Sequence, residues 1–238
     1  MSTTFSEILT SSAMQFIDDP RWSEQLALNP AQFFRAKSQA LIMAIPRFNR
    51  PPNIQSFFAY KNSASDDYTY IVTEEDTFPK TLETGLQRYE LVCVGTVVKS
   101  QNGSVTYTPY KEFVYDDITG NVILNEAIPA ETTVEIDFYT DGQFENDLDD
   151  TQKRIMGLCV AYDWYYKFAN SFYNVLNPVT DKTFSPRSAP SEDKRSNTSR
   201  MKELWQQLSS ELLAYEQGLY IRKYMPQSSW HDLVTPTN

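Results

Sequence analysis

The stretch Phe113-Val-Tyr-Asp-Asp-Ile-Thr-Gly-Asn-Val-Ile-Leu124, followed after a break at Pro129 by Thr133-Val-Glu-Ile-Asp-Phe-Tyr139, decides the fold class of this chain. In its last run apolar and polar residues alternate, which is the period of a β-strand with one buried face. Gly120 marks the preceding turn, where a residue that accepts positive φ lets two short strands pair. We therefore expect a β-meander from Val105 to Tyr139, with Val134, Ile136 and Phe138 on its buried face.

The strand pattern extends upstream of this stretch. Residues 68–73 predict a short strand, and the nearly continuous apolar run of residues 89–98 predicts a longer one buried on both faces. Asn102-Gly103 is typical of a hairpin turn into a strand over residues 105–108. Between the first two strands, residues 74–88 are polar and broken, and we expect at most one helical turn there.

Both ends of the chain have helical periodicity. In the N-terminal part the pattern predicts a helix over residues 6–17, and Asn29-Pro30 predicts an N-cap for a second helix over residues 31–45. In the C-terminal part, residues 149–176 and 199–222 predict two long amphipathic helices that pack as an antiparallel pair. The expected contact buries Ile155, Leu158, Tyr162, Ala169 and Phe172 against Leu204, Leu208, Leu212 and Leu219, and Phe34 and Leu41 of the N-terminal helix close the bundle.

These elements predict an α+β fold, in which a helical-bundle body carries an inserted antiparallel β-meander or hairpin region. We expect N-terminal helices in residues 1–53, a β-rich region in 54–145, the long helix pair with a polar loop at 177–198 in 146–222, and an arm in 223–238. Aromatic residues make up 14% of the chain, a share that suits interfaces as well as cores.

The charge balance and the cysteines exclude several classes of protein. A net charge of −10 argues against wrapping nucleic acid over the whole surface. Cys93 and Cys159 lie in apolar stretches without metal-ligand spacing, so we expect buried free thiols. The first residues lack a basic start followed by an apolar run, and no segment approaches about 18 consecutive apolar residues, so we expect no membrane partner.

Residues for catalysis are scarce, and we expect no enzyme, no cofactor and no metal. The only histidine, His231, lies in the predicted arm, away from any rigid nucleophile. The acidic run from Asp137 to Asp150 lacks the order of a calcium loop, and its last members suit a helix start. Glu135 and Asp137, on the same side of one strand, leave a carboxylate-pair hydrolase as an alternative.

Three groups of residues are candidate partner contacts. Tyr107, Tyr115 and Tyr139 are expected to be the exposed members of their strands, because aromatic residues anchor interfaces. Lys194 and Arg195 make the polar loop locally basic, which fits either a solvated loop or contact with a partner or a DNA phosphate. Trp230 and Leu233 have no periodic partner in the predicted arm, which either docks on another protein or stays a mobile tail.

The order of these pieces resembles the head-to-tail connector, or neck, proteins of tailed bacteriophages. The resemblance spans nearly the whole chain and rests on six pieces in sequence, each weak alone: Asp18-Asp-Pro-Arg-Trp22, Asn29-Pro-Ala-Gln-Phe-Phe34 with the helix end at Phe48, Val134 to Tyr139, Leu158-Cys-Val-Ala-Tyr-Asp-Trp164, Phe184-Ser-Pro-Arg187, and Arg200-Met-Lys-Glu-Leu204.

The resemblance implies a virion structural protein at the head–tail junction, made in the host cytoplasm. It implies a ring, commonly of twelve copies, that extends the DNA channel below the portal without sequence-specific DNA binding. The implied partners are the portal protein, copies of the chain itself, and the tail or a second neck protein. A tail, baseplate or receptor-binding component is the alternative structural role.

Overall fold

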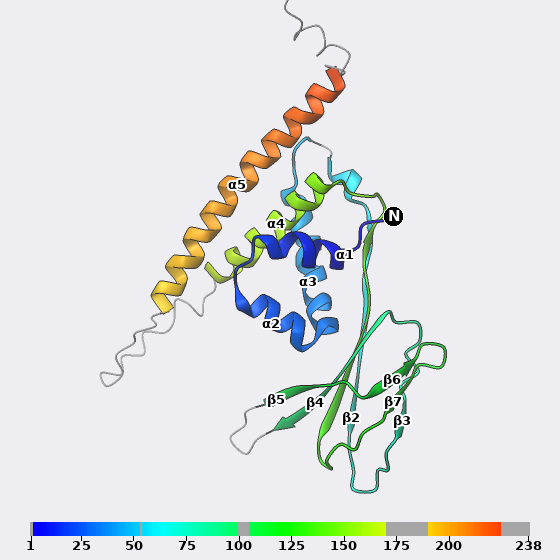
Figure 1. The fold of residues 1–238 in the computed structure, drawn as a ribbon. Coiled ribbons are helices and arrows are strands. Elements are labelled where there is room, and N and C mark those ends of the chain that lie inside the picture. Colours follow the sequence, from blue (N-terminus) through cyan, green and yellow to red (C-terminus); the bar gives the residue numbers. More distant parts are fainter. Residues whose placement is uncertain (1, 53, 100–104, 170–189, 225–238) are drawn as a thin grey trace, which may run out of the picture.

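The computed structural model describes residues 2–52, 54–99, 105–169 and 190–224. The fold is α+β, with helices and antiparallel sheets in separate parts of the molecule (Figure 1). The helices are α1 (Phe5–Glu7), α2 (Pro20–Leu28), α3 (Pro30–Ala44), α4 (Asp150–Ala169) and α5 (Pro190–Tyr224). The strands are β1 (Tyr60–Lys61), β2 (Ala64–Ile71), β3 (Lys80–Glu83), β4 (Leu91–Lys99), β5 (Val105–Tyr110), β6 (Phe113–Asp116), β7 (Asn121–Leu124), β8 (Thr133–Thr140) and β9 (Gln143–Phe144).

The first predicted helix is helical but irregular. After α1 the chain continues as a π-helix over Ile8–Ser12 and a 3-10 helix over Ala13–Gln15. Ile8, Leu9, Ala13, Phe16 and Ile17 are buried in the main core, as their periodicity predicts, whereas Met14 is exposed. One cause of the close packing is Gly157 of α4, where an added Cβ would lie 2.6 Å from the carbonyl carbon of Ser12.

The N-caps of α2 and α3 follow the sequence signals closely. Asp19 precedes Pro20 and accepts a hydrogen bond from the Arg21 backbone N–H, and Asn29 precedes Pro30 and accepts one from Gln32. Each cap satisfies a backbone donor that the first turn leaves without an intrahelical partner. Helix α3 then passes into a 3-10 turn at Ile45–Arg47.

Helices α4 and α5 form the predicted antiparallel pair. Gln152 donates to the hydroxyl of Tyr215 (2.7 Å), whereas Tyr162, farther along α4, packs on Trp205, earlier in α5, with ring centroids 5.3 Å apart. One apolar core contains Ile155, Leu158 and Tyr162 of α4, Leu204, Leu208 and Leu212 of α5, and Leu41 of α3, and Ala169 is also buried. Leu219 is only half-buried, and Phe34 stacks on Tyr139 of the sheet rather than closing this helix pair. Phe172 lies outside the described residues.

The expected loop over residues 177–198 is wrong in its second half, because α5 already begins at Pro190. Proline suits the first turn of a helix, where its missing N–H costs no hydrogen bond. The polar composition of this stretch therefore did not distinguish a loop from the start of a helix. Residues 170–189 lie outside the described part of the chain, including the predicted end of the helix that contains α4.

The β region contains two larger sheets that share one apolar core. The four-stranded sheet has the order β2-β8-β4-β5, and the three-stranded sheet has the order β3-β7-β6, with every pair antiparallel. Val134, Ile136 and Phe138 are buried in this core, as the alternation in β8 predicts. Residues 74–88, where we expect at most one helical turn, contain a strand that the sequence did not predict: Lys80–Glu83 pairs with β7 as β3, and Leu82 lies in the core.

The chain enters and leaves the β region at one place. Strand β1 pairs with β9 in a two-stranded sheet, with Tyr60 opposite Phe144. The N-terminal residues join this point, because the N–H of Phe5 donates to the carbonyl of Gly142 (2.8 Å) and the N–H of Phe144 donates to that of Thr3 (2.9 Å). The N-terminus is thereby fixed where the two parts of the molecule meet.

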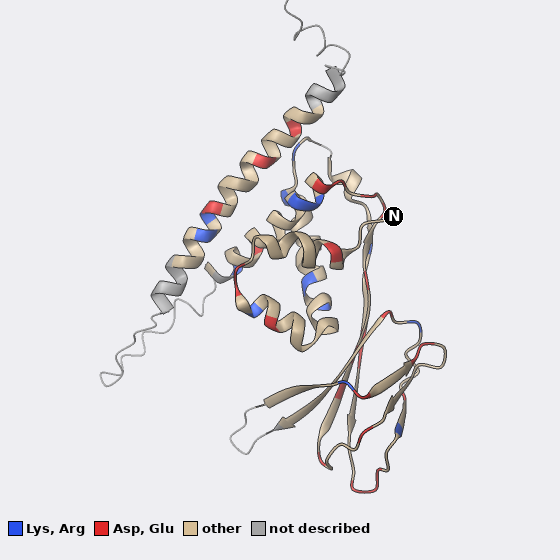
Figure 2. Cartoon of the chain, viewed as in Figure 1, with Lys and Arg blue, Asp and Glu red and all other residues tan. Residues whose placement is uncertain are grey.

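Charge is distributed unevenly between these parts. Residues 60–144 contain fifteen Asp and Glu against five Lys and Arg, and the rest of the chain contains sixteen of each kind. The β region therefore holds the whole net charge of −10. Figure 2 shows acidic residues along its strands and connections, whereas both signs occur on the helices.

We predict that Leu208→Ala lowers the free energy of unfolding by about 2–5 kcal/mol, because Leu208 is fully buried between α4 and α5 and its removal leaves a cavity. The matched control is Leu213→Ala in the same helix, where the side chain is 44% exposed and the expected loss is below about 1 kcal/mol. Urea denaturation measures both variants. Equal losses would contradict this packing.

Candidate interaction surfaces

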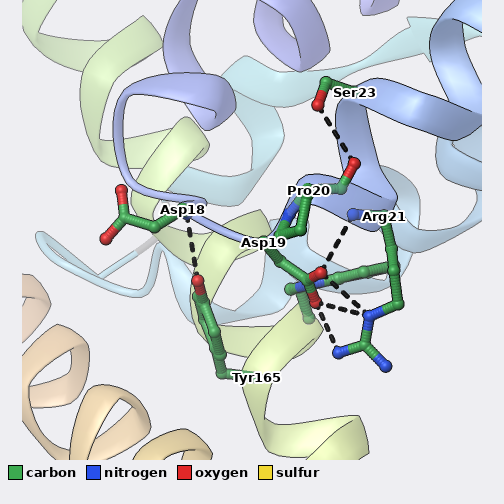
Figure 3. Close-up of polar contacts among 7 residues, drawn as sticks. Asp18, Asp19, Pro20, Arg21, Ser23 and Tyr165 are labelled. Atoms are coloured by element: carbon green, nitrogen blue, oxygen red, sulfur yellow. Dashed lines mark hydrogen bonds and ion pairs between the residues drawn. The ribbon is translucent and has the colours of Figure 1, made fainter.

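A polar network fastens the start of α2 to α4. The Asp19 carboxylate accepts hydrogen bonds from the Arg21 guanidinium, at 2.6 Å for Nη2, and from Nε1 of Trp164 at 3.2 Å. The neighbouring backbone N–H of Asp18 donates to the hydroxyl of Tyr165 at 3.0 Å (Figure 3). Burial alone raises the pKa of Asp19, but the hydrogen bonds from Arg21 and Trp164 outweigh it and hold the pKa below its usual value.

Helix α5 joins the same place through Arg200. Its Nη2 donates to the carbonyl of Phe16 at 3.2 Å and lies 3.4 Å from the Asp18 carboxylate. The Asp18 side chain is 78% exposed, so this ion pair by itself contributes little stability. Its effect is to fix the register of α5 against the N-terminal helices.

Lys37 is a buried cation enclosed by aromatic rings. Its Nζ lies 4.1 Å from the ring centroid of Trp164, 5.1 Å from that of Trp22 and 5.6 Å from that of Phe33. Desolvation lowers the pKa of Lys37 to about 8, the nearby Lys167 adds to this effect, and Asp19 opposes it. Cation–π contacts replace part of the hydration that the ammonium loses. The side chain is 8% exposed and serves packing rather than solution chemistry.

Helix α3 is fastened to the outward face of β8. The side-chain amide of Asn29 donates to the Asp137 carboxylate at 2.6 Å and to the hydroxyl of Tyr107 at 2.9 Å. Farther along, the hydroxyls of Ser38 and Tyr139 are 2.7 Å apart. Burial raises the pKa of Asp137 and the Asn29 hydrogen bond opposes this rise. The carboxylate of the alternative hydrolase pair is thus bound to a helix cap.

The expectation that three tyrosines face outward is wrong for Tyr139, whereas Tyr107 and Tyr115 are half-buried and make contacts within their own chain. Tyr139 is 2% exposed under α3. The Tyr107 ring occupies the space that a Cβ at Gly95 would need. Tyr115 donates to the carbonyl of Leu86 at 2.7 Å and its ring packs on Phe138. The alternation of residues along a strand shows which side chains share a face of the sheet. It does not show whether other helices or strands cover that face.

The remaining predicted contacts lie at the edge of the described structure or beyond it. Lys194 and Arg195 fall in the first turns of α5 rather than in a loop, which corrects their expected setting. Trp230 and Leu233 lie outside the described residues. The thiols of Cys93 and Cys159 are both free, but only Cys159 is fully buried, whereas Cys93 is half-buried.

A groove that the sequence did not indicate runs between the end of α3 and α5. It has a volume of about 470 Å³ and is lined by Met43, Pro46, Arg47, Asn49, Arg50, Trp205, Ser209 and Leu212. Met43 is 75% exposed and Trp205 is 49% exposed. Arg50 pairs with Glu216 of α5 at 3.3 Å, and the lining itself contains no carboxylate. Large apolar residues next to arginine are typical of protein-binding surfaces.

The groove is formed by segments that lie about 160 residues apart in the chain, so no local sequence pattern predicts it. The available signal was that Met43 and Trp205, two large apolar residues, fall on the outer sides of helices whose inner sides are already apolar. Within the described ranges, no group of three His, Cys, Asp or Glu residues has metal-binding geometry, and no helix is long and apolar enough to cross a membrane.

Comparisons with protein-family models, with curated proteins and with solved structures gave no match to this chain.

We predict that Lys37 makes the stability of the protein depend on pH. Between pH 8 and the ordinary lysine pKa of 10.5, the unfolded chain binds more protons at Lys37 than the folded chain, so the contribution of Lys37 to stability rises with pH. Relative to Lys37→Met, the free energy of unfolding of the wild type should gain about 1–2 kcal/mol from pH 8 to pH 10. Urea denaturation at several pH values measures this gain.

The control is Lys61→Met, which removes an exposed lysine and so measures the effect of losing one surface ammonium group at each pH. Each comparison is made against the wild type at the same pH, so the titration of buried tyrosines and of Cys159 cancels. A flat difference for Lys37→Met would show that the ammonium remains solvated.

Proposed function

We propose that this protein is a virion structural subunit of a tailed bacteriophage, which forms the head-to-tail connector ring at the neck. The ring, of about twelve copies as the resemblance implies, extends the DNA channel below the portal and docks the tail. Its role is to hold neighbours in place, without catalysis and without a cofactor. The subunit is made in the host cytoplasm and functions in the virion.

The observation that carries this proposal is that five of the six sequence pieces behind the resemblance contact one another in the fold, whereas the piece Phe184–Arg187 lies outside the described residues. Asp19 of the first piece accepts a hydrogen bond from Trp164 of the long-helix piece. Asn29 of the second piece binds Asp137 of the hairpin piece. Arg200 of the last piece reaches Asp18. Residues that determine how the parts of a fold join are the ones expected to persist in a family whose sequences differ elsewhere.

The arrangement of the chain also supports a role as a spacer. The helical part and the acidic β region are joined through α3 and β8, so the subunit presents surfaces of different charge at its two ends (Figure 2). A protein between the portal and the tail contacts different neighbours above and below. The negative β region repels DNA phosphates, which suits a channel that lets DNA pass without retaining it.

One microscopy experiment distinguishes the connector role from a tail or baseplate role. Electron microscopy of particles that contain the chain together with the portal locates it directly. A ring below the portal supports the connector role, and density at the tail tip or baseplate indicates a receptor-binding or baseplate component. A carboxylate-pair hydrolase would act as a free subunit, and Asp137→Asn would abolish its activity.

We predict that a chain ending at Met225 folds normally but fails to join portal-containing particles. The described helix ends at Tyr224, Pro226 prevents its simple continuation, and the removed residues include Trp230 and Leu233, which we propose to dock on the portal. The melting curve should be unchanged, and co-sedimentation with portal rings should be lost. Assembly equal to that of the full chain would show that residues 226–238 have no docking role.

A further inference from the structure

Strand β2 is an open edge of the four-stranded sheet. Among the described strands it pairs only with β8, in an unbroken register from Ala64 opposite Thr140 to Ile71 opposite Thr133. The edge strand β5 contains Pro109, which has no N–H to donate, and the edge strands β3 and β6 are four residues long each. Strand β2 has eight residues and no proline, so it is the edge best suited to accept a further strand.

The register identifies the backbone groups that face outward from β2. Val72, directly after the strand, donates to the carbonyl of Thr132 at 3.0 Å and accepts from the N–H of Glu131 at 2.8 Å, so its backbone groups face the side of β8. These groups alternate in direction along an antiparallel strand. The N–H and C=O groups that face away from β8 therefore belong to the odd-numbered residues, whose side chains are all exposed: Ser65, Asp67, Thr69 and Ile71. Consistent with this, the N–H of Asp67 donates to the neighbouring Asp66 carboxylate at 2.9 Å rather than to β8.

The two faces of β2 differ in chemistry. On one face, Tyr68 and Tyr70 pack as partly buried side chains against the core that the two sheets share. On the other face, Asp67 lies directly opposite Asp137 of β8, and like charges in this position repel each other. Arg35 pairs with Asp67 at 3.1 Å, but both side chains are exposed, so the pair offsets only part of this repulsion. A strand that fits beside β2 therefore places apolar residues next to the tyrosines and basic residues next to Asp67.

The charge of the β region determines the kind of partner that fits this edge. Residues 60–144 contain fifteen Asp and Glu against five Lys and Arg, and ion pairs between described residues occupy only Asp67 and Asp76 of these carboxylates. A second copy would bring two acidic strands together, and nucleic-acid phosphates would be repelled. We propose that β2 binds an extended segment of another protein, in which basic and apolar residues alternate and which adds a strand to the four-stranded sheet. This binding site goes beyond the connector role and does not depend on it.

A synthetic peptide tests this site with the full-length protein. The probe is Thr-Lys-Val-Lys-Val-Lys-Val-Thr, and the matched peptide, Thr-Lys-Lys-Lys-Val-Val-Val-Thr, has the same composition without the alternation. The probe should bind about tenfold more tightly than the matched peptide. In the bound state, amide hydrogen exchange at Ser65, Thr69 and Ile71, measured by NMR, should slow by about tenfold or more, because the added strand accepts their hydrogen bonds. Exchange at Tyr68 and Tyr70, whose N–H groups face β8, should stay the same.

A pair of substitutions with the same change of charge tests the position of the site. Asp67→Lys should weaken binding of the probe peptide by about tenfold, because it places a cation beside the basic residues of the added strand. Glu83→Lys is the matched control, since Glu83 is exposed and lies in β3, and its effect should stay below about twofold. Unchanged melting curves establish that both variants are folded.

Several results would overturn the inference. Absence of binding, equal affinity for the two peptides, or binding without slower exchange at the outward amides would show that no strand is added to β2. Slow exchange at the same amides without peptide, increasing with protein concentration, would identify a second copy as the occupant. Equal effects of Asp67→Lys and Glu83→Lys would show that only the overall charge matters. These measurements concern the isolated subunit, whereas microscopy of portal-containing particles tests the connector role.

Discussion

Helix α3 is held from two sides, and the arrangement of the molecule depends on this. On one side, Phe33 packs edge-on against Trp22, and Lys37 lies over the rings of Trp22 and Trp164. On the other side, Phe34 stacks on Tyr139 at 5.7 Å and Ser38 meets the Tyr139 hydroxyl. A helix that is covered on two sides cannot rotate or slide without breaking one of the contacts, so α3 transmits a fixed orientation from the helices to the sheets.

The Asn29 side chain completes this constraint at the start of α3. Its oxygen caps the helix, while its amide binds Asp137 and Tyr107 of the sheet. Removing it would leave a half-buried carboxylate and a backbone N–H without their partners at the same time, and unpaired buried polar groups cost more than the hydrogen bonds themselves contribute. The start of α3 and its position on the sheet are therefore determined by one residue.

Sequence reasoning was reliable where periodicity or capping acts within one element. The three- and four-residue apolar spacing predicted the contact of α4 with α5, and Asn29-Pro30 predicted the start of α3, because these signals arise from the geometry of a single helix. Sequence reasoning was unreliable where the burial of a residue depends on a second helix or strand that packs against it. Tyr139 lies on the face of β8 that the alternation predicts to be exposed, yet it is buried because α3 covers that face. The polar composition of residues 190–198 suggested a loop, since solvated helices and loops share that composition.

Sequence patterns did not predict the groove, because it forms only where α5 packs against the end of α3. The exposed apolar residues of the groove follow from the way α5 is packed. Leu204 and Leu208 are fully buried against α4, whereas Leu213 is 44% exposed and nothing within 4 Å would meet a Cβ at Gly218. The C-terminal end of α5 extends past the other helices (Figure 1). A helix with few tertiary contacts is only marginally stable in water, and glycine weakens it further. Covering the outer side of α5 therefore adds contacts that stabilise a helix whose C-terminal part has few of its own.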